Sequence, residues 1–255
     1  MNDHSTRVFE GKTVVVSGAS SGIGRAIAVQ LAQQGAGLVL IGRDRARLEE
    51  TAQRAGGPAY RIVQLDLTDV TAIMPAVKET VAAMGRLYGL CHAAGTVDTL
   101  PLSATSPEKL HAMMQVNFVA GMELARSVTR RDLLTEEGGS VLFIASIYGL
   151  VGKPGQIAYS GSKGAVTAGA RAMATELARR NVRVNVLSPG MVRTEMTERA
   201  LAGLSGHQVQ ALKDMHPLGI GSPDDVAHAA TFLLSPQSKW ITGANLVVDG
   251  GCSAQ

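Results

Sequence analysis

Apolar residues follow two patterns along the 255-residue chain. Short continuous apolar runs are separated by longer stretches in which apolar residues recur every three or four positions. The first pattern is typical of strands and the second of helices. The predicted strands are Thr13–Ser17, Leu38–Ile41, Arg61–Leu65, Gly89–Ala93, Ser140–Ile144, Arg183–Leu187 and Asn245–Val248. The predicted helices lie near Gly24–Gln34, Arg45–Arg54, Val70–Met84, Pro107–Leu134, Tyr159–Arg179 and Asp224–Leu234.

The order of these elements predicts an α/β fold. Strands that read as unbroken apolar runs usually have helices on both faces. Strands that alternate with helices form a parallel sheet with right-handed crossovers. We therefore expect a single doubly wound Rossmann domain over residues 1–255, with a seven-stranded parallel sheet flanked by helices. Residues 1–8 are expected to be flexible, and residues 195–221 to form a lid over the substrate.

Composition narrows the class of protein. Apolar residues make up 45% of the chain, which is enough for a core, but no run approaches the roughly 20 apolar residues of a membrane helix. The net charge of +3 is not gathered into basic stripes, so neither nucleic acid nor a membrane is an expected partner. The two cysteines, Cys91 and Cys252, have no metal-ligand spacing. We expect a reduced, soluble, cytoplasmic protein without a metal site.

A glycine-rich turn, with Gly18, Gly22 and Gly24, joins the first predicted strand to an amphipathic helix. Glycines let the backbone approach a pyrophosphate, and the helix N-terminus supplies free N–H groups and the positive end of a dipole. The spacing differs from the commoner G-x-G-x-x-G. The turn therefore predicts a dinucleotide site, and the alternative is a glycine-rich turn that binds nothing.

Tyr159 and Lys163 stand four residues apart at the start of a predicted helix, so their side chains share one face. A free tyrosine has a pKa of about 10, and a cation within about 4–6 Å lowers it. Tyr159 is then suited to general acid–base chemistry on a carbonyl or an alcohol. The alternative is an ordinary solvated helix face. Ser146, thirteen residues upstream, and the glycine turn favour the catalytic interpretation.

Polar and glycine residues follow the ends of five predicted strands: Gly18, Asp66, Gly95, Ser146 and Pro189. Ligands of such sheets bind beyond the carboxyl ends of the strands, where the winding reverses. These residues are therefore expected to line one groove.

In order along the chain, Gly18-x-x-x-Gly22-Ile23-Gly24, Asn117, Ser146, Tyr159-x-x-x-Lys163 and Pro189-Gly190 resemble the short-chain dehydrogenase/reductase family. The resemblance runs from about Phe9 to Gly251, and 3-oxoacyl-carrier-protein reductases are the most similar in appearance. It implies that Tyr159 donates the proton in carbonyl reduction and that Lys163 lowers its pKa and holds the nicotinamide ribose. It further implies that Ser146 aligns the substrate oxygen and that Asn117 kinks its helix and holds a water linked to Lys163. Asn117 could also be a tolerated polar helix residue.

The same resemblance implies the cofactor contacts. They are Gly18, Ser20, Ser21, Gly22, Ile23, Gly24, Arg43, Asp66, Leu67, Ala94, Gly95, Tyr159, Lys163, Pro189, Gly190, Val192 and Thr194. For Asp66 a role in turn formation is an equal alternative. The family's Asn-Asn-Ala-Gly segment is His92-Ala93-Ala94-Gly95 here, and His92 is expected to be structural.

The second predicted strand ends in Gly42-Arg43, which bears on the choice of cofactor. Members of the family that prefer NAD usually carry aspartate where Gly42 stands, and the glycine removes that carboxylate. Arg43 adds a guanidinium that can bind a 2′-phosphate bidentately. The sequence predicts NADP(H) over NAD(H), unless Arg43 only begins a solvated helix.

The leading functional hypothesis is an NADPH-dependent reductase of a small ketone or 3-oxoacyl group. The alternatives are an alcohol dehydrogenase working oxidatively and a catalytically silent cofactor-binding regulator. Apolar residues of the predicted lid could line the substrate or only pack the lid. The resemblance, with the apolar run Leu246-Val247-Val248 near the C-terminus, predicts a homotetramer.

Overall fold

The structure is a computed structural model that describes residues 7–203 and 205–254. Seven parallel strands form one sheet in the order β3-β2-β1-β4-β5-β6-β7. The strands are β1 Thr13–Ser17, β2 Gly37–Gly42, β3 Tyr60–Gln64, β4 Gly89–His92, β5 Gly139–Ile144, β6 Val182–Pro189 and β7 Asn245–Val248. The winding reverses between β1 and β4, so the sheet is doubly wound as predicted. Residues 1–6, on which most of the flexible segment was expected, lie outside the described part, while Val8 packs against the core.

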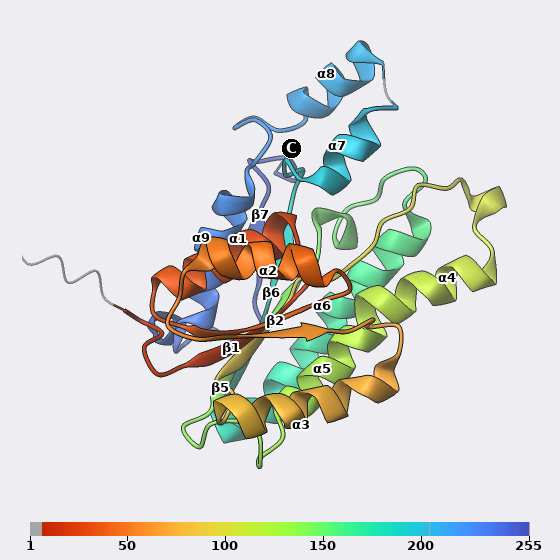
Figure 1. The fold of residues 1–255 in the computed structure, drawn as a ribbon. Coiled ribbons are helices and arrows are strands. Elements are labelled where there is room, and N and C mark those ends of the chain that lie inside the picture. The colour runs from red at the N-terminus through yellow and green to blue at the C-terminus, as the bar shows by residue number, and fades with distance from the viewer. Residues whose placement is uncertain (1–6, 204, 255) are drawn as a thin grey trace, which may run out of the picture.

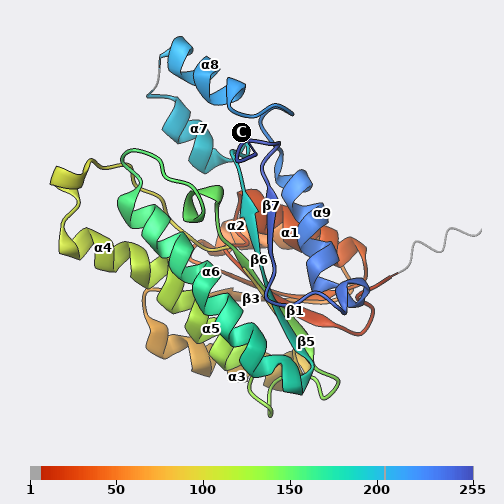
Figure 2. The ribbon, with the colours of Figure 1, turned by 180° about the vertical axis from the view of Figure 1, so that it is seen from behind.

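Helices cover both faces of the sheet (Figures 1 and 2). The three on one face are α1 Gly22–Gln33, α2 Arg45–Ala55 and α9 Pro223–Leu234. Those on the other face are α3 Ile73–Met84, α4 Pro107–Met114, α5 Ala120–Val128 and α6 Ile157–Leu177. The short helical turns are η1 Val70–Ala72, η2 Leu102–Ala104, η3 Gln115–Val119, η4 Ile147–Gly149, η5 Ala178–Arg180 and η6 Pro236–Ser238.

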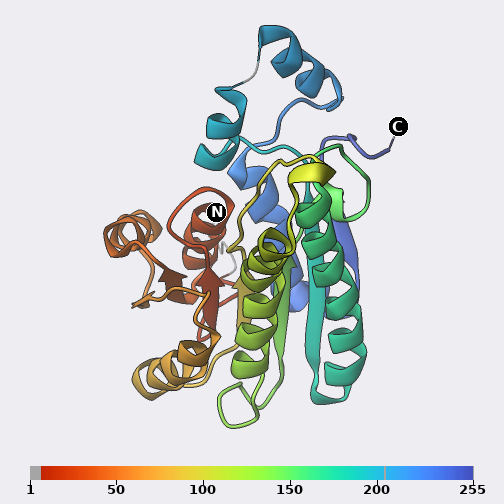
Figure 3. The ribbon, with the colours of Figure 1, turned by 90° about the vertical axis from the view of Figure 1, so that its right-hand side faces the viewer.

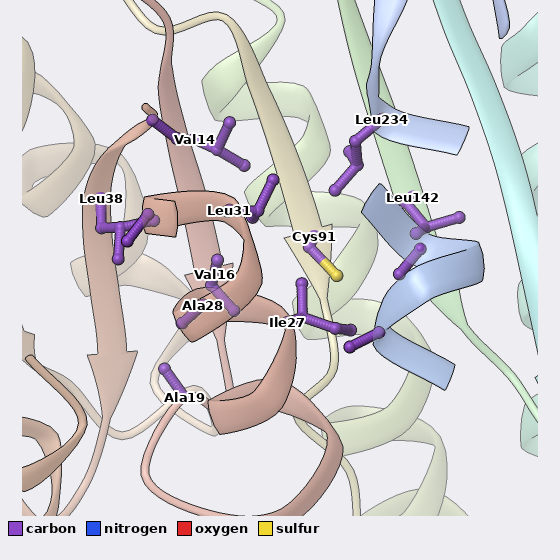
Figure 4. Close-up of a cluster of buried hydrophobic side chains, with 14 of the residues drawn as sticks. Val14, Val16, Ala19, Ile27, Ala28, Leu31, Leu38, Cys91, Leu142 and Leu234 are labelled. Atoms are coloured by element: carbon purple, nitrogen blue, oxygen red, sulfur yellow. The ribbon is translucent and has the colours of Figure 1, made fainter. Parts of the chain in front are cut away.

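Each face of the sheet has its own hydrophobic core, because neighbouring strand residues point to opposite sides. In β1, Val14 and Val16 pack under α1 with Ile27 and Leu31, as Figure 4 shows. Val15, between them, belongs to the core under α3, α5 and α6. The unbroken apolar runs of the sequence are explained by this double burial.

The predicted helix Pro107–Leu134 is wrong at its end, because the helix ends at Val128 rather than Leu134. A π-helical turn, η3, interrupts it at Asn117, where the resemblance implied a kink. Leu133 and Leu134 are buried, as their spacing suggested. Their segment is not helical, because the backbone on both sides of Leu134 pairs with Leu87: the Leu87 amide donates to Leu133, and its carbonyl accepts from Thr135.

Two helices missing from the predicted set, α7 Glu195–Leu201 and α8 Gly206–Asp214, rise beyond the carboxyl end of the sheet (Figure 3). Their starts follow from local chemistry, since the hydroxyls of Thr194 and Ser205 cap the first turns in reciprocal capping boxes. Among residues 7–203 and 205–254, no helix is long and apolar enough to cross a bilayer.

Candidate active site

The glycine turn between β1 and α1 is in close contact with the end of β4 and with the start of α1. Only glycine allows the backbone to approach so closely at these points. Gly18 has a φ of +68°, and a Cβ there would lie 2.7 Å from the amide nitrogen of Ala94. A Cβ on Gly24 would lie 2.3 Å from the carbonyl oxygen of Gly18. The backbone of the turn is therefore pressed against the end of β4, and the N-terminus of α1 stays open beside it. This cradle fits a dinucleotide pyrophosphate.

Thr194, the N-cap residue of α7, lies on the same turn. A Cβ on Gly22 would be 3.1 Å from the Cγ2 of Thr194. Ser21 is the N-cap residue of α1, and its side chain makes no capping hydrogen bond. Arg25 donates to the carbonyl of Ser20 and pairs with Glu50 at 2.9 Å. Arg25 therefore stabilises the turn, and its guanidinium already forms an ion pair with Glu50.

Ser146, Tyr159 and Lys163 converge between the end of β5 and the first turns of α6. Ser146 is nearly buried, and its Oγ accepts a hydrogen bond from the amide of Tyr148 at 3.2 Å. Lys163 donates from Nζ to the carbonyl of Ile144 at 2.9 Å. The same Nζ lies 5.7 Å from the centroid of the Tyr159 ring. The i, i+4 pair predicted from the sequence is present, on a buried helix face.

The electrostatics of this group differ from the sequence-based expectation. Burial raises the pKa of Tyr159, the hydroxyl of Ser146 lowers it, and the field of Tyr148 raises it further. Lys163 was expected to lower this pKa, but its ammonium bonds Ile144 instead. Burial also lowers the pKa of Lys163, to about 8. In this structure the phenol is a weaker acid than free tyrosine, because desolvation outweighs the hydrogen bond with Ser146.

Asn117 lies within the π-helical turn η3 and is fully buried. Its Oδ1 accepts from the amide of Thr96 at 2.8 Å, and its Nδ2 donates to the carbonyl of Thr96 and to the Oγ of Ser162. A Cβ on Gly95 would lie 3.1 Å from this Oδ1 and 3.4 Å from the Nζ of Lys163. Asn117, Gly95 and Lys163 are therefore neighbours, and the wider helical turn accommodates the amide.

The remaining predicted contacts occupy the same end of the sheet with differing local roles. Asp66 forms a turn, since its Oδ1 accepts from the amide and the hydroxyl of Thr68, and these bonds lower its pKa. Gly190 packs so closely on Asp249 that a Cβ would lie 2.8 Å from the aspartate Cβ. Leu67 and Val192 are buried. Pro189 ends β6, and Ile23 begins α1.

Two buried histidines have structural roles. The Nδ1 of His92 is 2.8 Å from the Oγ of Ser17, which ties β4 to β1, while its Nε2 has no partner among the described residues. His216, to which sequence reasoning assigned no role, accepts at Nε2 from the amide of Met191 and bonds the carbonyl of Leu212 through Nδ1. It joins α8 to the segment after β6. No short motif in the sequence marks such a contact.

Comparison with known proteins identifies the family. Residues 18–253 match the sequence model of the family described as enoyl-(acyl carrier protein) reductase. The chain is 36% identical to human 3-oxoacyl-[acyl-carrier-protein] reductase over 94% of this chain and 97% of that protein. The chain belongs to the short-chain dehydrogenase/reductase family. Galactitol 2-dehydrogenase (L-tagatose-forming) of Cereibacter sphaeroides is 37% identical, with 95% of each chain covered.

A solved dehydrogenase/reductase from Sinorhizobium meliloti 1021 superposes with a TM-score of 0.89 at 34% identity, over 97% of each chain. Short-chain dehydrogenase/reductases are oxidoreductases that use NAD(P)(H), so this protein is an enzyme of that class. The glycine cradle and the open N-terminus of α1 provide the place for such a cofactor. No cluster of three metal-binding side chains occurs in the described ranges.

His92→Asn should make folding less sensitive to acid. Burial, with a smaller contribution from the Lys163 charge, lowers the pKa of His92 to about 3, against about 6.5 in an unfolded chain. Between these values only the unfolded chain takes up this proton. The free energy of unfolding therefore falls as pH decreases from about 6.5, by about 2 kcal/mol at pH 5 from this residue alone. Urea unfolding at about pH 7.5 and pH 5 should show a smaller loss in His92→Asn by that amount. An equal loss in both proteins would contradict it.

Proposed function

We propose that the protein is an NADP(H)-dependent reductase that converts a ketone or a 3-oxoacyl group into an alcohol. The observation that supports this most is the convergence of Ser146, Tyr159, Lys163 and Asn117 next to the glycine turn. The presence of all four side chains in one buried cluster disfavours a catalytically silent regulator. The similarity to 3-oxoacyl-[acyl-carrier-protein] reductases favours the reductive direction.

In the proposed reaction, the Oγ of Ser146 and the hydroxyl of Tyr159 bind the substrate carbonyl oxygen. Tyr159 then gives its proton to that oxygen as negative charge develops on it. Lys163, buried beside the ring, stabilises the phenolate left behind. Asn117 fixes the loop at Thr96 and so keeps the space next to Lys163 open. A bound NADPH supplies the hydride, and the chain supplies position and the proton.

The preference for NADP(H) rests on the charges near the end of β2. Four arginines gather there, and three have acidic partners: Arg25 with Glu50, Arg45 with Glu49, and Arg47 with Glu195. Arg43 is exposed and, within the ranges that the structure describes, forms no ion pair within 4 Å. Its guanidinium is therefore available for a 2′-phosphate, and Gly42 places no carboxylate in the way.

We further propose that residues 195–221 act as the substrate lid. Their first helix, α7, is capped by Thr194, which lies against the glycine turn, and the Arg47–Glu195 pair links the helix to α2. An enzyme that oxidises an alcohol is the second candidate, supported by the 37% identity to galactitol 2-dehydrogenase. Rates in both directions on matched alcohols and ketones distinguish the two.

Tyr159→Phe should abolish turnover and leave NADPH affinity nearly unchanged, because the hydroxyl carries the proton and contributes little to cofactor binding. Loss of a positioned acid typically costs about 10²–10⁴-fold. Absorbance at 340 nm gives the rate on a ketone panel, and fluorescence titration gives the cofactor affinity. A variant that keeps more than about a tenth of the wild-type rate would show that Tyr159 is not the acid.

Arg43→Ala should weaken NADPH binding about ten- to a hundredfold and NADH binding far less, since a charge-assisted bond to the 2′-phosphate is lost. Gly42→Asp should reverse the preference by repelling the phosphate and accepting from the ribose hydroxyl. A Cβ at Gly42 would lie 3.2 Å from the Cδ2 of buried Leu48, so Gly42→Ala is the matched control for packing. Fluorescence titration of NADPH and NADH against wild type and each variant measures these affinities. Equal wild-type affinities for NADPH and NADH would refute the assignment.

The edge of the sheet at β7 provides a surface for the proposed homotetramer. β7 ends the strand order, and Trp240 beside it is 97% exposed. Phe232 of α9 and Leu246 and Val247 of β7 are exposed as well. Exposed apolar residues gathered on one edge are typical of an interface. Both cysteines are free, which fits the proposed cytoplasmic location.

Sedimentation at micromolar concentration should give a particle about four times the 26.5 kDa of one chain. Trp240→Lys should shift the population toward smaller particles, because it places a charge in the apolar surface. Leu102→Lys, at an exposed leucine outside this edge, is the control and should not do so. Wild-type particles of one-chain mass would exclude the tetramer.

A further inference from the structure

Lys153 lies in the loop between η4 and α6, and within residues 7–203 and 205–254 no carboxylate lies within 4 Å of its ammonium. Its Nζ is over the Tyr148 ring, 5.1 Å from the ring centroid. The residue is half-buried, and no ion pair or side-chain hydrogen bond of Lys153 occurs among the described residues. The ammonium is thus held against an aromatic face with no carboxylate partner in the described part of the chain, and its field also reaches the Cys252 thiol. Such a group gains strongly from an anion brought to it.

The ring beneath this ammonium belongs to the wall of the active site. The amide of Tyr148 donates to the Oγ of Ser146, so the two residues are fixed to each other. Gly149, the next residue, packs on α6 so closely that a Cβ would be 2.9 Å from the carbonyl carbon of Lys163. The field of Tyr148 also reaches the phenol of Tyr159. Tyr148 therefore stands between the catalytic cluster and the charge of Lys153.

The loop that carries Lys153 is fixed at its C-terminal end, at Gly155 and Gln156. The amide of Leu100 donates to the carbonyl of Gly155 at 2.8 Å, and the Nε2 of Gln156 donates to the Oγ1 of Thr99 at 2.7 Å. These bonds join the loop to the segment after β4. Figure 3 shows both at the end of the sheet that carries the lid helices. Lys153 therefore lies on a loop that is hydrogen-bonded to the segment after β4.

We propose that Lys153 forms an anion subsite of the substrate pocket, and that the substrate is an oxo acid whose carboxylate binds there while its carbonyl lies at Ser146 and Tyr159. This inference rests on the proposed reductase function and names its substrate class. Tyr148 would separate the two binding points and set the spacing between carboxylate and carbonyl. A substrate without charge would leave the ammonium uncompensated.

The test compares each oxo acid with its methyl ester, using acetoacetate and levulinate as acids with two spacings. Rates with NADPH are measured for wild type, Lys153→Met and Lys153→Arg. Lys153→Met should lower kcat/KM for at least one acid about ten- to a hundredfold, mainly through a higher KM, and leave its ester within about threefold. Lys153→Arg, which keeps the charge, should retain most of the preference. Added salt should weaken the binding of the acid and leave the binding of the ester unchanged.

Equal effects of Lys153→Met on acid and ester would overturn the subsite and leave the reductase function intact. The subsite would also be overturned if Lys153→Met left the reduction rate of the acids unchanged and lowered the melting temperature of the protein. That result would indicate that Lys153 pairs with an anionic group within the protein. If wild type reduces none of the four compounds, their binding to the enzyme–NADPH complex is measured by calorimetry. Binding of an acid that disappears in Lys153→Met, while the ester is unaffected, would support the subsite without the reaction. Binding that is unchanged in the variant, or absent for both acids, would overturn it.

Discussion

The candidate active site is organised around one buried charge without a carboxylate partner in the described chain, the ammonium of Lys163. It is buried at the carboxyl end of the sheet, with the carbonyl of Ile144 as its hydrogen-bond acceptor and no carboxylate within 4 Å in the described chain. Burial lowers its pKa to about 8, so keeping it charged at neutral pH costs about 3 kcal/mol. The residues around this ammonium leave open space beside it.

Several local features follow from this burial. Gly95 has no side chain at the point where a Cβ would approach both Lys163 and Asn117. Gly149 lets η4 pack directly on the backbone of Lys163, which places Ser146 and Tyr148 beside it. The π-helical turn at Asn117 satisfies the amide side chain against Thr96. A π-turn inside an α-helix often occurs at functional sites, and here it coincides with the proposed catalytic cluster.

The sequence predicted the parts of the structure that depend on periodicity and on glycine. β1 and β7 were located to the residue, because their apolar runs are bounded by turn-forming residues. The end of α5 was not, because Leu133 and Leu134 repeat the helical spacing while their backbone pairs with Leu87. The contacts of His216 with Met191 and of Arg47 with Glu195 could not be predicted, since each joins segments far apart in the chain. The cluster of Ser146, Tyr159 and Lys163 was predicted as a set, but the effect of its burial on the phenol pKa was not.

That effect bears on the protonation state in which Tyr159 would enter the proposed reaction. A reductase needs Tyr159 as a neutral phenol that holds its proton until charge develops on the substrate oxygen, whereas an alcohol dehydrogenase needs the phenolate as a base. Burial raises the pKa of Tyr159 and so favours the neutral phenol. The hydrogen bond from Ser146 and the nearby Lys163 then act mainly on the anion formed after transfer, since interactions with an ion gain strength in a desolvated site. The burial of Tyr159 therefore keeps the proton on the phenol in the ligand-free protein, which is the state from which the proposed reduction would start.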